Sequence, residues 1–89
     1  CEGGDVRSRL VNAEEWLKRH PRDPQLLLSL GRLCVQSQLW GKAESYLDAS
    51  LAILPGWEAH VELARLAERI GRTDDANRHY RAAAELSRR

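Results

Sequence analysis

Residues 27–55 read LLSLGRLCVQSQLWGKAESYLDASLAILP, and residues 60–87 read HVELARLAERIGRTDDANRHYRAAAELS. When the second stretch is aligned with the first at an offset of 33 residues, Leu30 falls on Leu63 and Gly31 on Ala64. Further along, Ala43 falls on Ala76 at the same offset. A period of about 33 to 34 residues is typical of repeats built from two helices, which stack into a solenoid.

The composition favours helices in every part of the chain. Ala, Leu, Glu and Arg dominate, Phe is absent, and β-branched residues are sparse. We therefore expect an all-α fold, an α–α superhelix of about two and a half repeats. Its five helices are short and their turns are tight, so neighbours should pack antiparallel. The predicted helices cover residues 5–20, 24–37, 40–53, 57–70 and 74–87.

The turns carry recognisable end signals. Asp23 is expected to cap the second helix, with Pro24 in its first turn, where the missing N–H costs nothing. Gly71 is a natural left-handed residue at the end of the fourth helix. Thr73 is expected to cap the fifth helix, because two aspartates follow it.

The repeated positions resemble the tetratricopeptide repeat (TPR) pattern of large, Leu-Gly/Ala, large, Ala, large, small and Pro. The second copy departs from this pattern at His60, where a large apolar residue is usual. The resemblance implies one TPR domain over residues 1–89, with a partial repeat at 5–20 and repeats at 24–55 and 57–87. Its structural positions are Leu27, Leu30, Gly31, Cys34, Ala43, Leu47, Pro55, Leu63, Ala64, Ala76, Tyr80 and Ala83.

A narrower resemblance rests on residues that the generic repeat does not require. The segments EEWLKRHPRDPQLLLSLGRL and QLWGKAESYLDASLAILP are similar to the C-terminal region of the HemY family, the protoheme IX biogenesis proteins. This resemblance implies a parent protein in the bacterial inner membrane, anchored by segments absent from this chain, and partners in haem metabolism. The stretch itself is expected to be soluble; the cytoplasmic side of the membrane is favoured, and the opposite side stays open.

Charge and residue counts argue against several other functions. The net charge of +1 gives no general attraction to nucleic acid. No uncharged stretch approaches the roughly 20 residues that span a bilayer. Two cysteines, one of them the terminal Cys1, do not make a disulfide framework, and the scattered Cys and His residues do not predict a metal site. No nucleophile with a base and no phosphate loop is visible, so we expect no enzyme.

Cys34 and the histidines are the residues with the most chemical potential. Cys34 could be a nucleophile or a haem ligand, but its spacing from Leu27 and Leu30 favours a buried packing position. His60 is the candidate ligand if the chain binds haem or another tetrapyrrole directly, which is the alternative function. Otherwise no cofactor is expected. His79 should face outward.

The first helix of each TPR unit lines the concave groove of the solenoid. Arg32 and Arg65 align and would form a fork for a carboxylate or an acidic segment of a partner. A solvated helix face with local pairing between glutamates and arginines is the competing interpretation, and both remain open. The predicted groove residues are Gln25, Leu28, Arg32, Val35 and Gln36, followed by Glu58, Val61, Arg65, Glu68 and Arg69.

The sequence therefore predicts a non-catalytic module that binds protein partners through its groove. Trp16, Trp40 and Trp57 are expected to anchor the packing between neighbouring units. Because solenoid units bury their faces only by stacking, we also expect that this chain either associates with itself through the outer faces of its end helices or is only marginally stable alone.

Overall fold

The protein is described here by a computed structural model, which covers residues 2–88 and the side chains of residues 6–88. These residues form five α-helices and no strand, so the prediction of an all-α chain is confirmed. The two ends of the predicted domain, Cys1 and Arg89, lie outside the described residues. The helices are α1 (Glu2–Arg19), α2 (Pro24–Gln36), α3 (Trp40–Ile53), α4 (Trp57–Arg69) and α5 (Thr73–Ser87).

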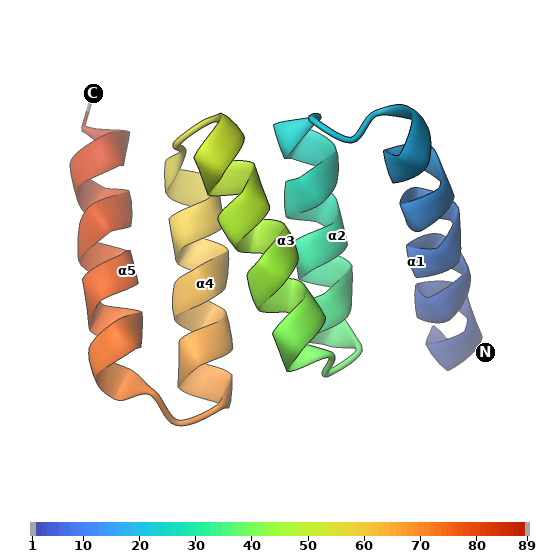
Figure 1. Ribbon diagram of the computed structural model, residues 1–89. Coiled ribbons are helices and arrows are strands. Elements are labelled where there is room, and N and C mark those ends of the chain that lie inside the picture. Colours follow the sequence, from blue (N-terminus) through green and yellow to red (C-terminus); the bar gives the residue numbers. More distant parts are fainter. Residues whose placement is uncertain (1, 89) are drawn as a thin grey trace.

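The helices lie side by side, from α1 at one edge of the molecule to α5 at the other, and the chain turns back at alternate ends (Figure 1). Each helix packs against the next one in the chain. In addition, α2 packs against α4, from which it is separated in sequence by the whole of α3. The first helices of the two predicted repeats are therefore neighbours in space.

Two of the predicted end signals act as expected and one does not. The Asp23 carboxylate accepts hydrogen bonds from the backbone N–H groups of Gln25 (3.1 Å) and Leu26 (3.3 Å) at the start of α2. Gly71 has φ +80°, the left-handed conformation that favours glycine. The prediction that Thr73 caps α5 is wrong, because the first helical bond of α5 already runs to the carbonyl of Arg72.

The packing between α2 and α3 depends on Gly31. A Cβ atom at Gly31 would lie 2.4 Å from Leu47 Cδ2, so the space is filled by the Leu47 side chain. Leu30, Cys34 and Leu47 are the largest fully buried side chains among the described residues. Burial also raises the pKa of the Cys34 thiol above its usual range, which makes this cysteine a poor nucleophile.

Four other expectations differ from the structure. Leu28, expected in the groove, is only 5% exposed and belongs to the main core cluster, because a leucine gains free energy by leaving water. Tyr80 is 36% exposed, although the repeat pattern places a large core residue there. Trp16 and Trp57 are about half exposed instead of closing the units, whereas Trp40 packs on the core.

Candidate functional site

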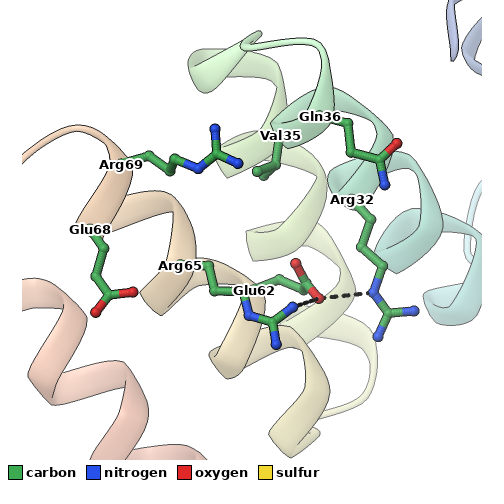
Figure 2. A pocket seen from close by; sticks show the side chains of 7 residues that line it. All are labelled: Arg32, Val35, Gln36, Glu62, Arg65, Glu68 and Arg69. Atoms are coloured by element: carbon green, nitrogen blue, oxygen red, sulfur yellow. Dashed lines mark hydrogen bonds and ion pairs between the residues drawn. The ribbon is translucent and has the colours of Figure 1, made fainter. Parts of the chain in front are cut away.

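A hollow of about 580 Å³ lies between α2 and α4, and every residue that lines it comes from these two helices (Figure 2). Residues one helical turn apart share a face, so Arg32 and Gln36 reach it from α2, and Arg65 and Arg69 reach it from α4. The hollow is called the α2–α4 groove below. Its lining residues are Arg32, Val35, Gln36, Glu62, Arg65, Glu68 and Arg69.

Most of the residues predicted for the groove lie in it, and four do not. Gln25 is exposed and Leu28 is buried, and neither lines the hollow. Glu58 and Val61, which were carried over from the second repeat, are half-buried outside it. The predicted residues that the structure brings together are Arg32, Val35, Gln36, Arg65, Glu68 and Arg69.

Glu62 is the groove residue that the sequence reasoning missed. Arg32 Nε donates to Glu62 Oε2 at 3.0 Å, and Arg65 Nη1 lies 3.6 Å from the same oxygen. The Glu62 side chain is only 9% exposed, and a carboxylate so far removed from water needs such charged partners. The spacing of three residues between Glu62 and Arg65 is a visible helical signal, but the bond to Arg32 spans thirty residues.

The contact between Arg32 and Glu62 links α2 to α4 directly across the floor of the groove. In Figure 2, the Arg32 and Arg65 side chains both point toward Glu62 from opposite sides. Of the two alternatives from the sequence, the structure shows the local pairing, and the fork for a carboxylate of a partner stays a prediction. Glutamate and arginine pair within α4, as the competing interpretation expects, but the same carboxylate also joins the two helices.

The groove keeps an excess of positive charge. Three arginines and two glutamates line it. Of the glutamates, Glu68 accepts a hydrogen bond at 2.8 Å from the Tyr80 hydroxyl of α5. Arg69 forms no ion pair with any residue that the structure describes. Its side chain extends across the groove toward Val35 (Figure 2). A guanidinium group has five N–H donors, so the groove can bind a carboxylate beside a small apolar surface.

The prediction that His79 faces outward is wrong. His79 is half-buried against His60, with the two Nδ1 atoms 3.1 Å apart and the ring centroids 5.3 Å apart. Burial, and to a lesser extent the charge of His79, lowers the pKa of His60 below its ordinary value. The third histidine, His20, stacks on Trp16 with ring centroids 4.8 Å apart.

A second polar cluster, which the sequence reasoning also missed, joins α1 to α3 through side-chain contacts. The Glu14 carboxylate lies 2.7 Å from Lys42 Nζ and accepts a hydrogen bond of 2.6 Å from the Tyr46 hydroxyl. The bonds from Lys42 and Tyr46 lower the pKa of Glu14. Burial and the bond to Glu14 raise the pKa of Tyr46, so its hydroxyl stays protonated and continues to donate.

Two further properties of residues 2–88 concern metal binding and membrane crossing. Within residues 2–88, no three His, Cys, Asp or Glu side chains come together as metal ligands would. No helix in this part of the chain combines the length and the apolar character needed to cross a bilayer. Direct binding of haem through His60 stays a prediction from the sequence.

The α2–α4 groove is a feature of the structure of this chain. It does not depend on the resemblance to TPR or HemY proteins, which also stays a prediction. Comparison of the chain with protein-family models, with curated proteins and with solved structures found no match.

Proposed function

We propose that the chain is a non-catalytic protein-interaction module of the TPR type, whose α2–α4 groove binds an acidic segment of a partner protein. The observation that carries this proposal is the convergence of three arginines from two helices on one open hollow. Arginine suits this role because its planar guanidinium group binds carboxylates through two parallel hydrogen bonds.

The repeat supports the solenoid part of the proposal. Gly31 and Ala64 occupy equivalent positions and are both buried, as expected where paired helices cross closely in a helical repeat. The turns at alternate ends of the molecule are those of antiparallel neighbours (Figure 1). In such a solenoid the first helices of successive units form the concave surface, and α2 and α4 are those helices.

The proposed binding mode follows from how each arginine is already used. Arg32 and Arg65 are held in place by Glu62, so their side chains lose little further freedom when a partner binds. Arg69 brings a positive charge that no described group balances. A carboxylate of the partner would bind Arg69 first, and an apolar side chain beside it would contact Val35.

The HemY resemblance extends this proposal to the cellular context. The parent would be anchored in a bacterial inner membrane, and its partners would belong to haem or tetrapyrrole metabolism. Support for this part comes only from the two sequence segments quoted above. Isolation of the full-length parent from its own membrane, with identification of the proteins that copurify, tests it; partners unconnected with tetrapyrroles would remove the haem assignment.

The groove itself can be tested with a glutamate-rich peptide and a matched glutamine-rich peptide. We expect the acidic peptide to shift the backbone amide resonances of α2 and α4 in a titration followed by NMR. The shifts should weaken as salt is added, because exposed charges are screened. Shifts confined to another surface, or equal shifts with the glutamine-rich peptide, would contradict the proposal.

Arg69→Gln is the cleanest variant for this titration, because it breaks no ion pair with a described residue. Arg81→Gln is its matched control, since Arg81 is exposed on α5 and does not line the groove. We expect weaker peptide binding for Arg69→Gln and unchanged binding for Arg81→Gln. Arg32→Glu is less informative, because it would place a second carboxylate against Glu62.

A further inference from the structure

The second repeat departs from the first at two positions that meet in space. His60 stands where the first repeat has Leu27, and His79 stands where it has Tyr46. In the first repeat, Leu27 is buried, and Tyr46 packs its ring on the core while its hydroxyl donates to Glu14. The two histidines lie nineteen residues apart in sequence, on α4 and α5, yet their Nδ1 atoms lie within hydrogen-bond distance.

We propose that His60 and His79 together form a two-histidine site for a divalent transition-metal ion. Imidazole nitrogen is a preferred ligand of Zn²⁺, Ni²⁺ and Cu²⁺. The site shares no residue with the α2–α4 groove, so it is independent of the function proposed above.

The distance between the two nitrogens suits one shared ion. Zinc binds imidazole nitrogen at about 2.0 to 2.1 Å, so two ligand atoms 3.1 Å apart subtend an angle of roughly 100° at the ion. This angle lies between those of square-planar and tetrahedral coordination. The two rings are tilted by 35° to each other, so they are not stacked face to face.

Binding of the ion replaces a hydrogen bond. Without metal, one Nδ1–H donates to the lone pair of the other Nδ1. With metal, the donor ring carries its proton on Nε2 instead, and both rings turn so that each Nδ1 lone pair faces the ion. The change moves a proton within one neutral ring and requires no other reactant.

Helices hold both ligands, and partial burial suits metal binding. His60 and His79 are half-buried, so they are restrained by packing while an ion can still reach them from solvent. The neutral form of imidazole is the form that binds metal. Because no third His, Cys, Asp or Glu of the described residues joins them, water would complete the coordination.

The first repeat itself supplies the variants that test the site. His60→Leu and His79→Tyr restore the residues of the equivalent positions, so they remove the ligands with side chains that this fold already accommodates. His20→Ala is the matched control, because it removes the remaining histidine. All samples should carry no affinity tag and should have Cys1→Ser, since a thiol is a strong metal ligand.

Calorimetric titration with zinc chloride and with nickel sulfate gives the first measurement. We expect saturable binding of one ion per chain, which persists in His20→Ala and is lost in His60→Leu and in His79→Tyr. Circular dichroism of each variant shows whether it has kept its helices. The proposal would be overturned if the chain with all three histidines showed no saturable binding, or if binding persisted when both His60 and His79 are replaced.

NMR of the imidazole groups, in the chain that keeps all three histidines, gives a second measurement that does not depend on histidine variants. Zinc should move the nitrogen resonances of His60 and His79 to those of the tautomer with the proton on Nε2, and should leave His20 unchanged. If zinc leaves all three rings unchanged, the pair is only a structural hydrogen bond. If it moves His20 instead, the site has been assigned to the wrong histidines.

Discussion

The α2–α3 pair and the α4–α5 pair carry a similar sequence pattern at an offset of 33 residues, but their side chains pack differently. In the first pair, Gly31 leaves space that Leu47 fills, and Leu47 has no exposed surface. In the second pair the equivalent residues are Ala64, which is fully buried, and Tyr80, which remains 36% exposed. The position of Gly31 is thus occupied by the larger alanine in the second pair, where Tyr80 turns to the surface instead of filling the space as Leu47 does.

This difference shows that the two repeat positions are coupled. Leu47 can occupy the space beside α2 only because residue 31 has no side chain. Tyr80 instead keeps its hydroxyl at the surface, where it donates to Glu68 of α4. Ala64, Ala67 and Ala76 form a small separate core cluster in the second pair, whereas the largest fully buried side chains, Leu30, Cys34 and Leu47, all belong to the first pair. The first pair should therefore contribute more to stability.

The largest expected effect comes from Leu47→Ala, which leaves a cavity in the first pair. We expect a loss of about 2–5 kcal/mol in the free energy of unfolding, measured by chemical denaturation. The matched change in the second pair, Tyr80→Ala, should cost only roughly 1 kcal/mol, because Tyr80 is partly exposed. Equal losses at the two positions would break the comparison.

Gly31→Ala tests the coupling directly. Its Cβ would lie 2.4 Å and 2.6 Å from Leu47 Cδ2 and Cγ, so we expect overpacking to cost about 1–3 kcal/mol, although alanine has the better helix propensity. The Gly31→Leu variant should be at least as damaging. The measurement is the melting temperature. If Gly31 were not coupled to Leu47, the substitution would leave the melting temperature unchanged or raise it.

A double-mutant cycle separates this clash from other effects of the new methyl group. In the Leu47→Ala background the clashing atoms are absent, so Gly31→Ala should become neutral or stabilising. A penalty of the same size in both backgrounds would show that Gly31 is required for a reason other than Leu47.

The start of α2 provides a smaller and more local difference between the pairs. Asp23 caps α2 through two backbone N–H groups, whereas Gly56 begins α4 without any side-chain cap. Asp23→Ala should lower the free energy of unfolding by about 0.5–2 kcal/mol. Gly56→Ala, its control, removes no capping bond and should change stability by less; the reverse order would contradict the assignment of the cap.

The smallest expected effect is a pH dependence of the contact between α1 and the first pair. Because the pKa of Glu14 is lowered in the folded protein, the ionised carboxylate stabilises the fold above its ordinary pKa of 4.5. This stabilisation is lost as the pH falls from 4.5 through the lower folded value. We expect a contribution of under about 1 kcal/mol, as for other partly exposed ion pairs.

Denaturation curves between neutral and acidic pH measure this contribution. Glu14→Gln should be less stable than the unsubstituted chain at neutral pH, and the difference in the free energy of unfolding should narrow on acidification. Glu44→Gln is the matched control, because Glu44 is an exposed residue of α3 without an ion pair in the described chain. A gap that stays constant with pH would show that Glu14 acts by packing alone.

The helices and most of the groove were predictable because they depend on local chemistry and on a regular repeat. The Asp23-Pro24 start of α2 and the Gly71 end of α4 lie within one or two residues of the observed boundaries. Arg32, Arg65 and Arg69 were predicted for the groove from the resemblance to TPR proteins, whose units line the groove with their first helices. The helical spacing of these side chains is a property of the backbone.

The unpredicted parts depend on contacts between helices. The spacing of three between Glu62 and Arg65 indicates a pair, but only the approach of α4 to α2 adds Arg32 to it. His79 looks like a surface residue until His60 is placed beside it. Tyr80 shows the same limit, because a pattern states which size of residue is usual and not which way the side chain turns.

By itself, the sequence determined that this chain is helical and placed most helix ends within one residue, because backbone hydrogen bonds and turn residues act over a few positions. It placed the start of α1 at residue 5, whereas this helix begins at Glu2. Only the tertiary structure decided which polar groups meet. The Arg32–Glu62 bridge, the His60–His79 pair and the Glu14–Lys42–Tyr46 cluster each join different helices across nineteen to thirty-two residues. Such contacts depend on how whole helices are oriented, which the packing of many side chains settles together.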